Sequence, residues 1–414
     1  MTSARDVVVT GLGATTPLGG DVPSTWEAAL AGKSGARTMD NDWAERYEIP
    51  VNFAATIKVK PEEVLKRPEL KRMDPSAQYA VIAAREAWKD AGEPEIDGER
   101  LGSVVSSGIG GVWTLLDGWD TLRERGARRL LPMTVPMLMP NSPTAFVSLD
   151  LGAKAGSHAL VSACASGAEA IGYGAEMIRS GRADVVVAGG TEATIHPMPI
   201  AAFAASRTLS LRNDDPEGAS RPYDVDRDGF VVGEGAAVVV LESAEHAAAR
   251  GARAYAKIGG VGLSSDAYHI TSPDPDGTGQ VAAMRAALED AGADGADVVH
   301  VNAHATSTKV GDLTETASIR RLFGSDADHV QLSATKSMTG HLLGGAGALE
   351  TVFTVKAIAD RLAPPTINVA NPDPELQVPL VRDEPAKLPG GDIAAINNSF
   401  GFGGHNVALL VQNA

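Results

Sequence analysis

The 414-residue sequence has one cysteine, 5% aromatic residues and no long apolar run. A single cysteine excludes an internal disulfide and a multi-cysteine metal site, so Cys164 acts as a lone thiol. The apolar runs, such as 235–241 and 407–411, are far shorter than the ~20 residues that a membrane helix needs. The first residues lack the basic and apolar regions of a signal peptide. We therefore expect a cytoplasmic protein without a transmembrane helix.

Positive charge is also scarce, with 36 basic residues against 52 acidic ones and a formal net charge of −16. Binding to nucleic acid or to an anionic membrane depends on a broad positive field, so neither is expected. An acidic protein partner would need a local basic patch. With 44% hydrophobic and 21% charged residues, the composition predicts one large or two closely packed globular domains.

Short β-branched runs alternate with alanine-rich stretches along almost the whole chain. Continuous apolar strands of this kind predict an α/β fold with a sheet covered on both faces, and the alternation favours parallel pairing. No repeat is visible by eye and no low-complexity linker separates the halves, which are expected to share an interface. The predicted strands are 6–10, 103–107, 158–162, 184–189, 236–241, 257–263, 298–302, 330–333, 393–397 and 406–411.

Cys164 is predicted to lie where a strand turns into a helix. Apolar residues recur at helical spacing over 165–179, and Gly181 is placed to end that helix. A helix N-terminus can lower a thiol pKa from about 8.5 into the range of about 3.5–7.5. The alternative is that Cys164 is a small buried apolar residue, as most lone cysteines are.

Two histidines and a glycine-rich segment also follow predicted strands. His304 stands in a hydroxyl-rich loop, and His341 follows a run of small and polar residues. Each histidine alone is more often structural, but their shared position at strand ends favours a catalytic role. In the segment 397–406, Phe400 and Phe402 stand among glycines, which permit close approach and can aim N–H groups at an oxyanion. The alternative is a tight turn between two core strands, in which the rings of Phe400 and Phe402 only fill space.

Dinucleotide binding is a competing interpretation, because 7–13 resembles the opening of a Rossmann turn. The pattern continues as Gly11-x-Gly13-x-x-Thr16, so the third glycine is missing, and Pro17 interrupts the helix that would receive a pyrophosphate. Walker phosphate loops, Gly-x-Ser-x-Gly elbows and His-Glu-x-x-His metal motifs are absent from the sequence. An oxidoreductase or a non-catalytic scaffold remains the alternative from another class.

Taken together, these motifs resemble the β-ketoacyl-[acyl carrier protein] synthases of types I and II, within the thiolase-like condensing enzymes. Ser162 and His405 resemble the forms found in actinobacterial members, whereas Ala305 replaces a usual glycine and Lys309 a usual proline. Because Ala305 carries a Cβ, the local turn is expected to differ slightly. The likeness covers essentially the whole chain through 9–13, 107–111, 164–167, 221–224, 226–230, His304, 336–341 and 400–404.

The resemblance implies a five-layered α-β-α-β-α fold built from two similar halves, usually as a homodimer. The halves would be 1–255, with the nucleophile Cys164, and 256–414, with His304, His341 and the glycine-rich loop. The implied reaction is a decarboxylative condensation of an acyl-Cys164 thioester with malonyl-ACP in type II fatty acid elongation, with the histidines as enolate donors. The alternative within the family is the ketosynthase subunit of a type II polyketide synthase.

The resemblance also implies supporting roles around these three residues. Lys336 would support the histidine geometry within a network that includes Glu350, and Cys164 and Phe402 would offer N–H groups to the thioester oxygen. No resident cofactor or metal is implied, because phosphopantetheine arrives on the acyl carrier protein. The remaining implied residues are Phe400 with Phe402 for the gate, Thr306 and Thr308 for phosphopantetheine, and Ile109 and Phe203 for the acyl pocket. For each candidate carrier-docking residue, the alternative is that it simply belongs to a solvated charged face. The candidates are Lys66, Arg67, Lys71, Arg72, Arg128, Arg129 and Arg207.

Overall fold

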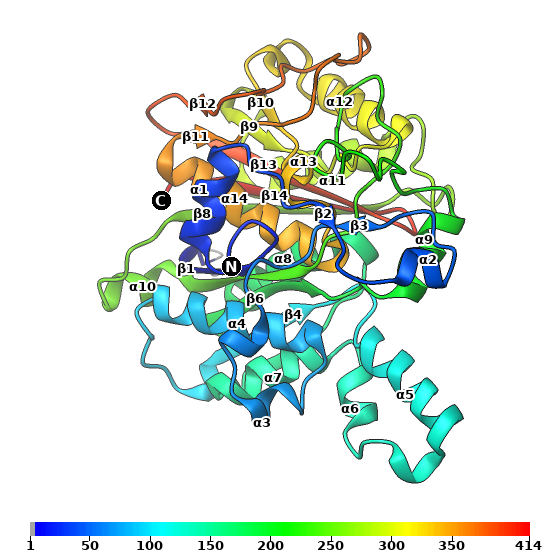
Figure 1. Cartoon of the computed structure of the whole chain (residues 1–414). Coiled ribbons are helices and arrows are strands. Elements are labelled where there is room, and N and C mark those ends of the chain that lie inside the picture. Colours follow the sequence, from blue (N-terminus) through cyan, green and yellow to red (C-terminus); the bar gives the residue numbers. More distant parts are fainter. Residues whose placement is uncertain (1–4) are drawn as a thin grey trace.

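The computed structural model describes residues 5–414 and has one continuous sheet in the order β10-β9-β13-β14-β8-β1-β7-β6-β4-β5 (Figure 1). Each of the ten predicted strands overlaps one strand of this sheet, so the predicted α/β class is confirmed. The sheet strands are β1 (Val7–Thr15), β4 (Leu101–Ser106), β5 (Gly156–His158), β6 (Val185–Glu192), β7 (Gly235–Ser243), β8 (Ala256–Ser265), β9 (Val298–Asn302), β10 (Gln331–Ser333), β13 (Ala394–Gly401) and β14 (His405–Gln412). Two small pairs are β2 (Arg37–Thr38) with β3 (Phe53–Ala54) and β11 (Leu362–Ala363) with β12 (Ala386–Lys387).

The helices occupy the connections between these strands, with several short 3₁₀ segments. The α-helices are α1 (Val22–Leu30), α2 (Trp43–Arg46), α3 (Arg67–Leu70), α4 (Pro75–Asp90), α5 (Val112–Arg125), α6 (Thr134–Leu138), α7 (Ser142–Leu151), α8 (Ser166–Arg179), α9 (Pro197–Ala205), α10 (Ala244–Ala249), α11 (Thr278–Ala291), α12 (Lys309–Phe323), α13 (Lys336–Thr339) and α14 (Ala346–Asp360). The 3₁₀ segments used below are η3 (Ala127–Arg129), η4 (Ala163–Ala165) and η7 (Leu343–Gly345). Within residues 5–414, no helix is long and apolar enough to cross a bilayer.

The sheet consists of two arrays with the same topology. In the first array β1 pairs antiparallel with β7 and β7 with β6, whereas β6, β4 and β5 run parallel. Strands β8, β14, β13, β9 and β10 repeat this arrangement in the second array. Within residues 5–414, strand pairing between the arrays is limited to Val8 and Val9 of β1 with Lys257 and Ala256 of β8. The repeat that the sequence conceals is therefore present in the strand order.

Parallel pairing holds for the outer strands only, so the expectation of a mostly parallel sheet is wrong for the strands near the centre. Strands β13 and β14 are joined by a three-residue turn, and such a short connection permits antiparallel pairing alone. The predicted boundary between 255 and 256 falls at the first residue of β8. The division of the chain into an N-terminal half, 1–255, and a C-terminal half, 256–414, stays a prediction.

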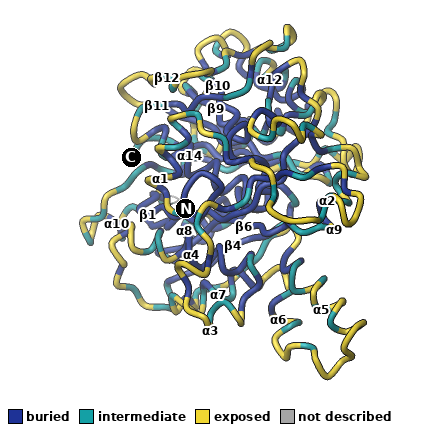
Figure 2. Tube along the Cα trace, in the orientation of Figure 1, coloured by how far each residue is buried: buried dark blue, intermediate teal, exposed yellow. Residues whose placement is uncertain are grey.

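Helices α8 and α14 lie between the two arrays, while α4 and α7 cover one outer face and α11 and α12 the other (Figure 1). This is the five-layered α-β-α-β-α fold that the resemblance implied. Helix α8 is rich in glycine and alanine, and most of its residues are buried because both arrays pack against it. The centre of the molecule is accordingly buried, and exposed residues gather on the outer helices and loops (Figure 2).

The glycines of the apparent Rossmann turn belong to helix packing. A Cβ on Gly13 would lie 1.9 Å from the carbonyl oxygen of Ala83 in α4, so β1 can approach this helix only with glycine there. The nearby backbone N–H groups of Leu12 and Ala14 already donate to the carboxylates of Asp90 and Glu86. A pyrophosphate at this position would face two carboxylates, which removes the support for dinucleotide binding.

Candidate active site

Cys164 lies in η4, directly before α8. The preceding strand β5 ends at His158, earlier than the predicted 162, so a short loop carries the chain to the cysteine. Ala163 has φ 51°, an unusual conformation for a residue with a Cβ, which makes the turn before Cys164 sharp. The thiol is free and only 8% of the residue is exposed. The predicted position between a strand and a helix is confirmed, with the loop and η4 interposed.

Burial raises the pKa of the Cys164 thiol to about 11. The backbone N–H of Phe402 and the charge of Lys336 act in the opposite direction with smaller effects. The structure therefore predicts a raised thiol pKa where the helix N-terminus alone predicts a lowered one, because removing the thiolate from water outweighs the nearby donors and positive charge. Any thiolate at this position must form together with proton transfer to another group.

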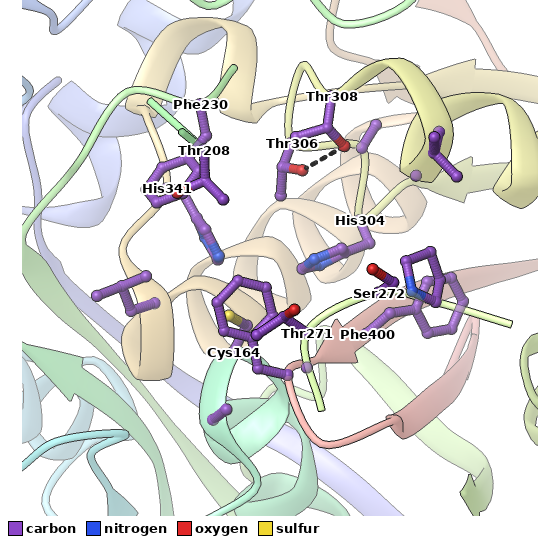
Figure 3. Close-up of a pocket in the computed structure, with 18 of the residues that line it drawn as sticks. Cys164, Thr208, Phe230, Thr271, Ser272, His304, Thr306, Thr308, His341 and Phe400 are labelled. Carbon is purple, nitrogen blue, oxygen red and sulfur yellow. Dashed lines mark hydrogen bonds between the residues drawn. The ribbon is translucent and has the colours of Figure 1, made fainter. Parts of the chain in front are cut away.

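His304 and His341 face each other across the space above Cys164, and their ring nitrogens point toward that space (Figure 3). The ring centroids are 5.5 Å apart with the planes at 85°. Burial lowers the pKa of both imidazoles well below the usual range, and the charge of Lys336 lowers it further. Nδ1 of each ring is buried without a hydrogen-bond partner, which leaves Nε2 as the nitrogen that faces the cavity. Both side chains are therefore neutral at physiological pH and can present an Nε2–H donor.

Lys336 and Glu350 form a buried ion pair beneath the two histidines. Lys336 begins α13 and is 1% exposed, and its Nζ donates to the carboxylate of Glu350 on α14, which is 2% exposed. Burial raises the pKa of Glu350 to about 7, against the opposing charge of Lys336. The predicted association of these two residues is present in the structure, and the charge of Lys336 adds to the effect of burial in lowering the pKa of both imidazoles.

Two buried carboxylates beside the cavity were missed from the sequence. Glu315 on α12 accepts from the backbone N–H groups of His304 and Ala305, both at 2.9 Å, and from the side-chain amide of Asn398 at 3.0 Å. It thus holds the loop that carries His304, including the alanine that replaces the usual glycine. Glu192 ends β6 and is fully buried in the cavity wall. An acidic residue directly after an apolar strand is the same signal that drew attention to the histidines, so Glu192 could have been found.

The turn between β13 and β14 closes over the cysteine. A Cβ on Gly401 would lie 2.4 Å from the carbonyl oxygen of Ser162, so this close approach requires glycine. Phe402 follows at the tip and is 38% exposed, whereas Phe400 packs on His304 with ring centroids 5.8 Å apart. Both predicted gate residues line the cavity, and Phe402 brings its N–H to the sulfur of Cys164.

A cavity of about 550 Å³ joins these groups to the surface. The predicted acyl-pocket and phosphopantetheine residues all line it, with the hydroxyls of Thr306 and Thr308 3.3 Å apart (Figure 3). Phe203 on α9 stacks edge-on against Phe230, which in turn stacks edge-on against His341. The sequence-predicted residues that line this cavity are Ile109, Cys164, Phe203, Arg207, Thr306, Thr308, His304, His341, Phe400 and Phe402.

The predicted carrier-docking residues fall into three separate groups. Arg207 is exposed and lines the cavity, which places it at the entrance. Arg128 and Arg129 are exposed in η3, between helices α5 and α6, which project from the body as a lobe (Figure 1). None of the other six lines the cavity within this chain. The group around α3 consists of the exposed residues Lys66, Arg67, Lys71 and Arg72.

Comparisons with known proteins agree with this geometry. Models of the beta-ketoacyl synthase N-terminal and C-terminal domains match residues 4–247 and 255–370. The chain is 47% identical over 416 residues to "3-oxoacyl-[acyl-carrier-protein] synthase 2" of Staphylococcus aureus, covering 100% of this chain and 99% of that protein. It is 44% identical over 404 residues to the protein of that name from Mycobacterium bovis, covering 97% and 96% of the two chains.

One solved structure is a type II polyketide synthase acyl-carrier protein in complex with its ketosynthase, bound to a hexaketide. It superimposes with a TM-score of 0.90 at 31% identity, covering 99% of this chain and 100% of that chain. The resemblance read from the motifs is thus confirmed over the full length. The chain therefore belongs to the beta-ketoacyl synthase family, whose members are condensing acyltransferases.

Proposed function

We propose that the chain is a 3-oxoacyl-[acyl carrier protein] synthase II, which condenses an acyl thioester with malonyl-ACP in fatty acid elongation. The observation that carries the proposal is the meeting of one cysteine and two neutral histidines at a single cavity (Figure 3). A nucleophile and two convergent N–H donors are the groups that a decarboxylative thioester condensation needs. The identities to the curated relatives support the same reaction.

The first step is transfer of the acyl group to Cys164. The sulfur attacks the thioester carbonyl carbon, the carbon–sulfur bond to the phosphopantetheine breaks, and the proton of Cys164 passes to the departing thiolate, which leaves as a thiol. The backbone N–H groups of Cys164 and Phe402, which already lie against the sulfur, are the donors closest to the developing oxyanion. Because the resting thiol is neutral, the proton must move as the carbon–sulfur bond forms.

The second step is decarboxylation of malonyl-ACP. The bond to the carboxylate breaks, CO₂ leaves, and the electron pair forms an enolate whose oxygen accepts from Nε2–H of His304 and His341. The enolate carbon then attacks the acyl carbonyl, and Cys164 leaves as a thiolate that regains a proton from water. Burial, with the charge of Lys336 adding to it, keeps both imidazoles neutral, and a neutral imidazole offers Nε2–H without an added charge. Glu350 holds Lys336 in place.

The cavity fits a substrate that enters as a long arm. Thr306 and Thr308 offer hydroxyls near the entrance for the phosphopantetheine, while Ile109 and Phe203 line the side toward the acyl chain. Phe402 is the gate residue at the tip of the turn. This assignment needs no resident metal or cofactor, and that absence stays a prediction.

An acidic carrier protein would approach the entrance at Arg207. The overall charge of −16 repels such a partner, so docking must rest on local basic residues. We expect the KM for malonyl-ACP to rise with ionic strength, and the Arg207→Ala variant to lose part of that dependence. An unchanged salt dependence in this variant would remove Arg207 from the docking surface.

We also propose a homodimer built on the lobe of α5 and α6 and on the open edge at β5. Strand β5 is the last strand of the sheet order, and unpaired edges are usually covered. The lobe exposes apolar side chains, including Trp119 at 57% and Val135 at 62%, and α7 exposes Leu149 at 79%. Sedimentation equilibrium should give twice the chain mass, and the Trp119→Glu variant should shift toward monomer. A wild-type monomer would overturn this part of the proposal.

The rival function is that of the ketosynthase subunit of a type II polyketide synthase. It is favoured by the structural similarity to such a ketosynthase, at lower identity than to the fatty acid enzymes. A polyketide subunit would depend on a different partner chain, whereas the proposed enzyme acts alone. Condensation by the purified single chain therefore separates the two.

The deciding experiment is intact-protein mass spectrometry with acyl-ACPs of graded length, followed by malonyl-ACP. We expect one acyl group on wild type, none on Cys164→Ala, and discharge as β-ketoacyl-ACP when malonyl-ACP is added. If no primer acylates Cys164 while the protein is folded, the proposed function fails.

A further inference from the structure

Glu192 is a buried carboxylate in the cavity wall with no cationic partner. None of the lysines, arginines or histidines in residues 5–414 lies within ion-pair distance of it, unlike Glu350. Burial raises the pKa of Glu192 to about 7, and the groups that oppose this shift are hydrogen-bond donors instead of a cation. A buried charge without a cation is costly, and such a group needs an explanation.

The carboxylate organises the turn that follows β4. One oxygen accepts from the hydroxyl of Ser107 at 2.7 Å and from the N–H of Ile109 at 3.4 Å, and the other from the N–H of Gly108 at 2.9 Å. The N–H of Gly110 donates to the same serine hydroxyl at 2.8 Å. Through direct bonds and one serine, Glu192 fixes this whole turn, and the turn carries the acyl-pocket residue Ile109.

The same carboxylate reaches into the second half of the chain. The N–H of Gly344 in η7 donates to Glu192 at 3.0 Å, next to Leu343, which is 5% exposed and has φ 47°. Leu343 lines the cavity and belongs to the same apolar cluster as Cys164. Ile109, which is 44% exposed, and Leu343 both line the cavity that holds Cys164, and they stand on backbone segments, one from each half, that one carboxylate holds.

We propose that Glu192 is a positioning residue that determines which acyl primers Cys164 accepts, by fixing Ile109 and Leu343 in the cavity wall. The inference rests on the proposed function and adds the residue that sets acyl-chain selectivity. Its position resembles that of Glu315, whose carboxylate holds the N–H groups of the His304 loop. Glu315 is thus the positioning residue of the loop that carries His304, and Glu192 is the positioning residue of the cavity wall at Ile109 and Leu343.

The test compares Glu192→Gln with wild type over acyl-ACPs of graded length, measured as the rate of Cys164 acylation at each length. A glutamine keeps one acceptor oxygen and turns an amide N–H₂ toward the donors on the other side, so at least one of the two segments, at Ile109 or at Leu343, loses its hydrogen bonds and shifts. We expect the ratio of rates between the best and the worst primer to fall about tenfold, as for the loss of one hydrogen bond to a charged group. Decarboxylation of malonyl-ACP without primer should stay within about twofold of wild type.

Glu86→Gln is the matched control. Glu86 also accepts from two backbone N–H groups, those of Ala14 and Val22, and burial also raises its pKa to about 7, but it lies outside the cavity. This variant should keep the wild-type profile of rate against chain length. If Glu192→Gln does not fold, Ser107→Ala removes one donor and should change the ratio in the same direction by about threefold.

The outcomes separate the two proposals. A profile that keeps its shape, whether unchanged or lowered equally at every length, overturns the role of Glu192, because a merely structural loss reduces the active fraction alone. If wild type itself is not acylated by any primer, the proposed function fails instead. A flattened profile with normal decarboxylation supports the assignment.

Discussion

The two halves of the chain share one scaffold and carry different chemistry at equivalent positions. In the first half, the connection from β5 to α8 holds Cys164, and in the second, the connection from β10 to α14 holds Lys336 and His341. The connection after β4 likewise carries Ile109, and the one after β9 carries His304. Because α8 and α14 lie side by side between the arrays, the two sets meet at one cavity. The matching strand order of the two halves supplies equivalent positions, and the proposed mechanism divides the reaction between them into acyl transfer and decarboxylation.

The halves differ most in the connection between their two long antiparallel strands. Strands β13 and β14 are joined by the tight turn at 402–404, whereas β6 and β7 are separated by the excursion 193–234, which contains α9. The long excursion brings Phe203 and Arg207 to the cavity, and the short turn brings Phe402 over the cysteine. The connection of the first half therefore contributes lining residues at Phe203 and Arg207, and that of the second half contributes the predicted gate residue Phe402.

Removal of the nucleophile is the strongest test of the proposed division of acyl transfer and decarboxylation between the two halves. Cys164→Ala should abolish covalent acylation and lower condensation by at least about 10⁴-fold, because the chain has no other thiol. Decarboxylation of malonyl-ACP should persist, since it is assigned to the second half. Release of ¹⁴CO₂ from labelled malonyl-ACP measures this; a loss of decarboxylation equal to that of condensation would break the comparison.

Replacing the histidines tests the other half. His304→Ala and His341→Ala should each lower condensation by about 10²–10³-fold through loss of one enolate donor. Acylation of Cys164, followed by intact mass, should remain within about tenfold of wild type. Phe230→Leu, which changes the ring stacked on His341 without removing an N–H donor, is the control and should cost far less. Equal loss of acylation and condensation in the histidine variants would contradict the division.

The repeated glycines test whether the halves are equivalent as scaffolds. A Cβ on Gly13 would lie 1.9 Å from the carbonyl oxygen of Ala83, and one on Gly262 would lie 1.8 Å from that of Ala283. We therefore expect Gly13→Ala and Gly262→Ala to destabilise the protein by similar amounts, about 1–3 kcal/mol each. Urea denaturation measures this. Gly251→Ala has open space around its Cβ but a positive φ, so it reports the backbone cost alone.

The sequence predicted the positions of the strands well, but it predicted poorly how the strands pair with one another. All ten sheet strands were found because buried strands are continuous apolar runs, but pairing direction depends on connections that periodicity does not reveal. The repeat was hidden because Gly11-x-Gly13 and Gly260-x-Gly262 are too short a match by themselves, and their equivalence is evident from the helix packed on each pair. The motif residues lining the cavity were predicted from the family resemblance, whose assignment to beta-ketoacyl synthases is confirmed. Glu192 and Glu315 were missed because their donors lie far away in the sequence or on another element.

The thiol pKa provides the last test, because the sequence and the structure predict opposite shifts for it. A helix N-terminus alone would lower the pKa below about 7.5, whereas burial in the structure raises it to about 11. Since the thiolate is the reactive form, a raised pKa means that alkylation by iodoacetamide is slow at pH 7 and rises about tenfold per pH unit up to about pH 10. Phe402→Ala keeps the N–H group but opens the cavity to water, so its alkylation should be faster at every pH. A rate that reaches a plateau below pH 7.5 in wild type would show that the donors around Cys164 outweigh its burial, and that acylation begins from a resting thiolate.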